Sequence, residues 1–260
     1  MATVSEFSIG TPCWFELGTV DQAAAKDFYS RIFGWTPVDL PSGPNEFYTI
    51  FQLAGRNAGG AYALSPSGGT PGSGPRWRVY FFTPDVDVST SKVAELGGSV
   101  LHPPSDVMDV GRMSTCKDPE GAVFSLWQPK KHNGDGVLNE AGAVGWCELA
   151  TRHTAQAREF YTGLFGWTTK SSSVLATYIE FSTDGKPRGG LLPMGDEWGD
   201  AESRWGIYIF VDDCDATVAQ AKELGATVCF GPISAPGVGR FAALNDPQGA
   251  TFSVITPIPA

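Results

Sequence analysis

The 260-residue sequence has no long hydrophobic run, and no stretch approaches the roughly 20 apolar residues that a membrane helix needs. Positive charge is also scarce, since 18 Lys and Arg stand against 28 Asp and Glu, a formal net charge of −10. A negative surface repels nucleic acid and anionic lipid, so we expect neither as a partner. No basic segment followed by an apolar one occurs at the N-terminus, so we expect a cytoplasmic protein.

Residues for metal or nucleophilic chemistry are few. The five cysteines are odd in number and form no C-x-x-C pair, so we expect scattered buried thiols in a reducing compartment. The three histidines are isolated: His102 falls at a strand end, His132 in a linker and His153 at the start of a helix. No G-x-S-x-G nucleophile elbow occurs. These absences disfavour a zinc site and a serine hydrolase.

Glycine, proline and aromatic residues are abundant, with 32 Gly, 19 Pro, 16 Phe, 8 Trp and 7 Tyr. Such a composition is typical of many short strands joined by turns.

The sequence also contains an internal repeat: WFELGTVDQAAAKDFYSRIFGW from residue 14 matches WCELATRHTAQAREFYTGLFGW from residue 146. Gly59-Gly60 matches Gly189-Gly190, and V-G-R and D-P-x-G both recur 128 residues later. The chain is therefore a tandem duplication.

Each copy predicts the same order of elements. Period-two alternation predicts a strand over 13–18, and apolar residues spaced by four predict a helix over 21–33 that Gly34 ends. Further strands are expected at 35–39, 47–53 and 58–64, and the pattern then restarts with a strand at 77–83, a helix at 86–96 and strands at 99–102, 112–116 and 122–128. We expect an α+β protein with domains at 8–130 and 143–259, joined by a linker over 129–142.

Three motifs resemble those of the vicinal-oxygen-chelate superfamily. They are the helix endings FYSRIFGW and FYTGLFGW, the V-D-D-C-D segment before a later helix, and D-P-x-G before the last strand. This superfamily groups glyoxalases, bleomycin-resistance proteins and extradiol dioxygenases. The resemblance covers nearly the whole chain, twice. It implies two tandem glyoxalase-like domains, each made of two β-α-β-β-β modules whose joined mixed sheet forms a cup around a ligand.

The resemblance also implies where metal ligands would lie, because metal-dependent members place His, Glu or Gln on the first, fifth and last strands of a domain. The corresponding residues in this sequence are Trp14, Arg78 and Ser125, and then Trp146, Gly206 and Ser253. None is a usual ligand of a divalent cation. We therefore expect no metal and no other cofactor; the alternative is a divalent Fe, Zn, Mn or Ni ion held by a shifted set that includes Glu16 or Glu148.

Alternation along the strands indicates which side chains face the cup. The candidate ligand-binding residues are Trp14, Arg78, Tyr80, Ser125, Trp127, Trp146, Tyr208 and Ser253. An aromatic lining with a few polar groups is typical of a pocket for a flat organic molecule. Close packing of the same side chains is the alternative, because small barrels fill themselves.

Glu16 and Glu148 are the candidate catalytic residues, since an inward carboxyl walled by Trp would have a raised pKa suited to acid–base chemistry. A structural alternative pairs Glu16 with Arg78 and Glu148 with Arg240. Arg112, like Arg240, either binds a ligand anion or forms a salt bridge to the aspartate of D-P-x-G.

Three classes of function remain open. The sequence favours a glyoxalase-like or bleomycin-resistance-like protein, monomer or homodimer, that binds a small organic, aromatic molecule without metal. The alternatives are a metal-dependent lyase, hydroxylase or dioxygenase, and a non-catalytic scaffold with a vestigial cavity. Fold alone does not choose among them.

Overall fold

The computed structural model describes residues 7–44, 46–64, 74–134, 136–172 and 177–258. The expected end of the second domain, residue 259, lies outside this range. The elements of the first half are β1 (Pro12–Thr19), α1 (Gln22–Phe33), β2 (Thr36–Gly43), β3 (Glu46–Leu53), β4 (Arg56–Ala63), β5 (Arg76–Phe82), α2 (Val86–Glu95), β6 (Ser99–Val107), β7 (Gly111–Lys117) and β8 (Val123–Pro129). Those of the second half are β9 (Val144–Thr151), α3 (Thr154–Phe165), β10 (Thr168–Ser171), β11 (Ile179–Thr183), β12 (Lys186–Pro193), η1 (Asp196–Trp198), β13 (Arg204–Phe210), α4 (Cys214–Glu223), β14 (Thr227–Ala235), β15 (Gly239–Asn245) and β16 (Thr251–Pro257).

Each half forms one eight-stranded mixed sheet, which confirms the predicted architecture. The strand order is β2-β3-β4-β1-β5-β8-β7-β6 in the first sheet and β10-β11-β12-β9-β13-β16-β15-β14 in the second. Strands β1 and β4 run parallel within one module, β5 and β8 run parallel within the next, and the antiparallel pair β1–β5 joins the two modules. Two β-α-β-β-β modules therefore share a single sheet.

Local sequence sets the helix ends. The Asp21 side chain accepts a hydrogen bond from the Ala24 backbone N–H, which satisfies one free donor of the first turn of α1. Gly34 ends the helix in the left-handed conformation, with φ 70°. The strand expected at 99–102 runs on to Val107, and its pairing with β7 shifts register between Val100 and Ser105. Pro103 and Pro104 lie in this stretch and donate no ladder hydrogen bonds, which explains the irregular pairing.

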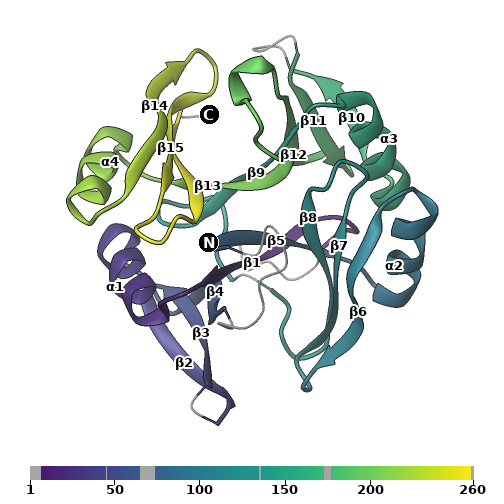
Figure 1. The fold of residues 1–260 in the computed structure, drawn as a ribbon, viewed down its shortest axis with the longest axis horizontal. Helices are drawn as coiled ribbons and strands as arrows, with labels where there is room; N and C mark the ends of the chain where they lie inside the picture. The colour runs from purple at the N-terminus through teal and green to yellow at the C-terminus, as the bar shows by residue number, and fades with distance from the viewer. Residues whose placement is uncertain (1–6, 45, 65–73, 135, 173–176, 259–260) are drawn as a thin grey trace.

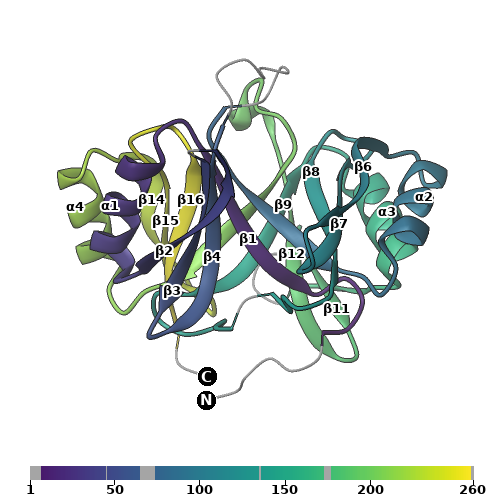
Figure 2. The same ribbon diagram turned by 90° about the horizontal axis from the view of Figure 1, so that it is seen from below.

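The two halves pack back to back. Figure 1 shows the first sheet as an arch that opens in one direction and the second as an arch that opens the opposite way, with their convex sides meeting near β5 and β13. Helices α1 and α4 lie side by side on one flank, and α2 and α3 on the other, in both views (Figures 1 and 2). One continuous hydrophobic core therefore lies between the convex faces and the helices.

Two buried hydrogen-bond chains join the halves through this core. The Trp77 indole N–H donates to the Tyr29 hydroxyl (3.0 Å), which donates to Asp246 of the other half (3.0 Å). In the symmetric position Trp205 donates to Tyr161 (2.8 Å), which donates to Asp118 (3.0 Å). The Phe-Tyr of each helix thus meets the Asp-Pro-x-Gly turn of the other copy, which gives both repeated motifs a structural role.

Candidate functional site

The concave side of each sheet carries the residues that the repeat singled out. We call the concave side of the first sheet, around Trp14, Glu16 and Tyr80, the first cup, and that of the second sheet, around Trp146, Glu148 and Tyr208, the second cup. Side chains alternate along a strand, so Trp14 and Glu16 of β1 face the cup while Phe15 and Leu17 enter the shared core.

A hydrogen-bonded chain of side chains lies at the centre of the first cup. The Trp14 indole N–H donates to the Tyr48 hydroxyl (2.8 Å), and Tyr48 donates to Glu16 Oε1 (2.9 Å). Tyr80 donates to the other carboxylate oxygen, Oε2 (2.6 Å). Burial and the nearby Glu16 carboxylate hold the pKa of both tyrosines well above the ordinary value, so their hydroxyls remain donors.

The second cup repeats this arrangement. Trp146 donates to Tyr178 (2.8 Å), Tyr208 donates to Glu148 Oε1 (2.8 Å), and Tyr178 also hydrogen-bonds the carboxyl group. The repeated glycine at position 190 is required here, because a Cβ on Gly190 would overlap the Tyr178 hydroxyl. Tyr48 and Tyr178 stand at equivalent positions of the repeat, 130 residues apart, and this equivalence is the signal in the sequence that could have found them.

Arg78 neighbours Glu16 across the β1–β5 ladder. Burial alone would lower the pKa of Arg78, but Tyr80, Tyr62 and Glu16 outweigh it and raise the pKa. The Arg78 Nε is buried and has no hydrogen-bond partner. Arg78 thus supplies a positive charge beside Glu16, although the closest partners of the carboxylate are the two tyrosine hydroxyls.

The remaining candidate residues of the first cup are packed. Trp14, Tyr80 and Trp127 are 4%, 3% and 5% exposed and belong to one cluster. Ser125 is fully buried, pairs with Tyr80 in the β5–β8 register and shares a hydrogen bond with Thr115 (3.1 Å). These residues lie together and pack against one another.

His132, which the sequence placed in the linker without a role, lies against the first cup. Its ring packs edge-on against Trp14 at a centroid distance of 4.5 Å, and its carbonyl accepts from the Trp127 indole N–H (3.0 Å). Burial lowers the pKa of His132, so the ring is neutral near pH 7. The chain between the halves thus covers part of the first cup.

The second cup is more open. Trp146 and Tyr208 are partly exposed where Trp14 and Tyr80 are buried. Gly206 stands where the first half has Arg78, and among the described residues a Cβ there would meet the Glu148 carbonyl oxygen alone, at 3.8 Å. Ser253 hydrogen-bonds Tyr208. The lining continues outward through aromatic rings, with Tyr208–Phe241 and Phe241–Phe230 centroids 6.2 and 6.1 Å apart, and Phe230 is 52% exposed.

Burial dominates the electrostatics of Glu148. Burial raises the pKa of Glu148, and the hydrogen bonds from Tyr208 and Tyr178 and the more distant charge of Arg204 offset this only in part. A carboxyl group with a raised pKa, facing a partly exposed space, is suited to proton exchange with a bound molecule.

The structure corrects the pairings expected for two arginines. Arg240 does not contact Glu148 and does not bond Asp246, because its guanidinium forks onto Asp215 of α4. Arg112 makes the same contact with Asp87 of α2 (2.8 and 2.9 Å) instead of bonding Asp118. Both aspartates lie in the first turn of a helix, so each pair ties a strand to a helix N-terminus.

The cysteines also differ from expectation at one position, since Cys229 is exposed while the other four are buried.

The residues at the superfamily's metal-ligand positions do not fit a divalent cation. Trp14, Arg78 and Ser125 in the first cup, and Trp146, Gly206 and Ser253 in the second, offer two hydroxyls and no carboxylate or imidazole. Within the described ranges no three His, Cys, Asp or Glu side chains gather as a metal site would need. Each cup has one central Glu held by tyrosine hydroxyls.

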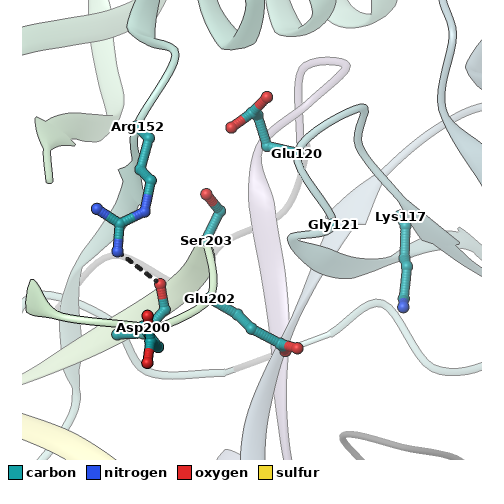
Figure 3. A pocket seen from close by; sticks show the side chains of 8 residues that line it. Lys117, Glu120, Gly121, Arg152, Asp200, Glu202 and Ser203 are labelled. Atoms are coloured by element: carbon teal, nitrogen blue, oxygen red, sulfur yellow. Dashed lines mark hydrogen bonds between the residues drawn. The ribbon is translucent and has the colours of Figure 1, made fainter.

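Among the described residues, hollows also lie outside the centres of the cups. One, of about 470 Å³, lies at the seam between the halves, where Trp146 and Phe210 of the second cup approach Phe15 and Leu138. Another, of about 260 Å³, is polar, and in Figure 3 the Arg152 guanidinium turns toward the backbone that follows η1. Arg152 donates hydrogen bonds to the carbonyls of Gly199 and Ala201, so its guanidinium stabilises the segment that follows η1. The 260 Å³ hollow is therefore a poor candidate for a ligand site.

The sequence model of the Glyoxalase/Bleomycin resistance protein/Dioxygenase superfamily matches residues 13–126 and again residues 143–254. The chain belongs to this superfamily. It is 41% identical over 260 residues to "Putative glyoxylase CFP32" of Mycobacterium tuberculosis, covering 98% of each chain. It is 35% identical over 263 residues to "Anthracycline biosynthesis protein DnrV" of Streptomyces peucetius, covering 97% of this chain and 95% of that one.

Solved structures share the superfamily fold at low sequence identity. A Mn(II)-bound glyoxalase from Novosphingobium aromaticivorans superposes with a TM-score of 0.66 at 16% identity, covering 96% of this chain and 83% of that one. Homoprotocatechuate 2,3-dioxygenase of B. fuscum gives 0.66 at 14% identity, covering 97% and 72%. At such identity the likeness establishes the fold alone. In the described part of the chain no helix is long and apolar enough to span a membrane.

Proposed function

We propose that this member of the glyoxalase superfamily binds a small, largely aromatic organic molecule in its second cup, against Glu148 and Tyr208, without a metal ion. The observation that carries the proposal is the contrast between equivalent positions of the two cups. The first is filled by Arg78, Trp127 and His132, whereas the second has Gly206 at the position of Arg78 and keeps its central tyrosine partly exposed.

The lining of the second cup suits such a ligand. Tyr208, Phe241 and Phe230 present ring faces and edges from the centre of the sheet to its rim. Aromatic pockets with few polar groups bind flat organic molecules, and the polar groups fix their orientation. Here the orienting groups are the Glu148 carboxyl and the hydroxyls of Tyr178 and Tyr208. Two relatives carry names that refer to a glyoxylase and to anthracycline biosynthesis, both concerned with small organic molecules.

Calorimetric titration with 2-naphthol, a neutral planar probe, tests the proposal. Gly206→Arg, which gives the second cup the side chain that the first already holds, is expected to abolish binding. Gly206→Ala is the matched control: its methyl group has room, since the nearest atom would be 3.8 Å away, so binding should stay within a few-fold of wild type. Binding that survives Gly206→Arg, or no binding by the wild-type protein, would contradict the proposal.

A second candidate function is catalysis with Glu148 as general acid or base. It is favoured by the raised pKa of this buried carboxyl and by its contact with Tyr208. Glu148→Gln retains the shape and one acceptor oxygen but cannot exchange a proton. Turnover of a bound compound that depends on pH and disappears in Glu148→Gln would support an enzyme. Unchanged turnover in that variant would exclude Glu148 as the acid or base.

A further inference from the structure

The two cups have diverged in charge along one row of side chains. In the first sheet the register places Val38, Ile50, Gly60, Glu16 and Arg78 side by side across β2, β3, β4, β1 and β5. In the second sheet the same row, across β10, β11, β12, β9 and β13, reads Lys170, Glu180, Gly190, Glu148 and Gly206. Neighbours in such a row point to the same side of a sheet.

This row changes the charge balance around the central carboxylate. The first row holds one carboxylate, Glu16, and one guanidinium, Arg78, which cancel. The second holds two carboxylates, Glu148 and Glu180, and one ammonium, Lys170, which leaves one negative charge. The Lys170–Glu180 pair is loose, at 3.9 Å, and Lys170 is 72% exposed, so this pair offsets little of the charge.

Arg204, a cation that neighbours the second cup, does not distinguish it from the first cup or replace Arg78. Arg204 lies two residues before Gly206 and corresponds to Arg76, so each half has one arginine at this position. The Arg204 guanidinium lies over the Trp198 ring, 5.1 Å from its centroid. The second cup therefore keeps the carboxyl and tyrosine arrangement of the first but has Gly206, without a side chain, where the first has the Arg78 cation.

We infer that the ligand of the second cup is an organic cation, an amine, amidine or guanidine on a flat apolar body, whose positive group lies beside Glu148 where Arg78 lies beside Glu16. The inference rests on the proposed function and adds the chemical class of the ligand. A cation desolvated against a carboxylate and ringed by tyrosine gains both an ion pair and cation–π contact. The aromatic rings of Phe241 and Phe230 would take the apolar body.

The test compares phenylguanidine, a cation at neutral pH, with phenylurea, its neutral counterpart of nearly the same shape. By calorimetric titration the wild-type protein is expected to bind phenylguanidine about tenfold tighter or more, the factor that one charge-assisted hydrogen bond contributes. In Glu148→Gln the two affinities should become nearly equal. Glu159→Gln, which removes a carboxylate from the exposed side of α3, is the control for net charge and should leave the ratio unchanged.

The possible failures separate this inference from the proposed function. Equal affinities in the wild-type protein, both lost in Gly206→Arg, would overturn the cationic ligand and leave the second cup as the binding site. A preference that persists in Glu148→Gln, or that falls as far in Glu159→Gln, would also overturn it, because the charge would then act from elsewhere. Absence of binding by both compounds overturns the inference, and the 2-naphthol titration then decides the proposed function independently.

Discussion

Removal of one buried hydroxyl tests how the halves are held together. Tyr161 is fully buried, and its hydroxyl accepts from Trp205 (2.8 Å) and donates to Asp118 of the other half (3.0 Å). In Tyr161→Phe the Trp205 N–H loses its partner inside the core, at a cost of ~1–3 kcal/mol. Asp118 loses one of its hydrogen bonds, at ~1.5–3 kcal/mol, but keeps those from the Glu120 and Ala122 N–H groups on its other oxygen.

Asp118 keeps its backbone hydrogen bonds, and the losses at Trp205 and Asp118 arise from the same hydroxyl, so the two costs do not add in full. We therefore expect the free energy of unfolding to fall by about 3 kcal/mol. Urea denaturation at pH 7 measures this loss as a lower midpoint with an unchanged slope. Tyr29→Phe removes the symmetric hydroxyl between Trp77 and Asp246 and should cost the same within about 1 kcal/mol. Ser91→Ala, which removes an exposed hydroxyl, is the control and should cost less than about 0.5 kcal/mol.

Two results would refute this reasoning. A loss below about 1 kcal/mol in both tyrosine variants would mean that the hydroxyls are replaced by water or rearrangement and do not hold the halves together. Two separate unfolding transitions in the wild-type protein would mean that the halves do not share a cooperative core, contrary to the packing of their convex faces.

Two further predictions concern pH and metal. Burial raises the pKa of Asp118 to about 6 in the folded protein, above the unfolded value of about 3.9. The stabilising contribution of this carboxyl group is therefore complete below about pH 4 and is lost as the pH rises through 6. The loss in the free energy of unfolding is ~3 kcal/mol at most. The stability of the wild-type protein relative to Asp118→Asn should therefore fall between about pH 4 and pH 7 in urea titrations. A constant difference over this range would contradict the burial argument. Protein purified without chelators should contain far less than one Fe, Zn, Mn or Ni ion per chain by elemental analysis, because the ligand positions hold Trp, Arg, Gly and Ser. One equivalent of metal that disappears in Glu148→Gln would show that these residues were wrongly judged unable to hold a metal site.

The concave arrangement could be predicted in part because it depends on period and repeat. Trp14 and Glu16 share a strand face by alternation, and their recurrence at Trp146 and Glu148 marks both as cup residues. Tyr48 on β3 and Tyr178 just before β11 complete the hydrogen-bond chain, but each lies 32 residues away in sequence from its partner on the first strand of its half. Their part in the site depends on sheet register, which a single sequence does not specify across a curved sheet.

The pairing of the charged groups could not be predicted for a related reason. Arg112 and Asp118 are near in sequence, yet Arg112 reaches Asp87, because the strand and helix N-terminus that hold them pack together. Asp118 instead accepts a hydrogen bond from Tyr161, 43 residues away in the other half. Hydrogen-bond partners follow spatial packing, and long-range packing is decided by how whole layers meet.

The sequence alone determined the duplication, the order of strands and helices and the face of each strand that enters the core, because these depend on local period and residue chemistry. The resemblance to the superfamily added the metal-ligand positions, and the residues that stand there are poor ligands of a divalent cation. Only the tertiary structure decided that the convex sides pack together, that His132 covers the first cup and that the second cup is the open one. These features depend on contacts between segments far apart in the chain. Gly206 stands beside Glu148, where the first half has Arg78, only once the strands are aligned in the sheet.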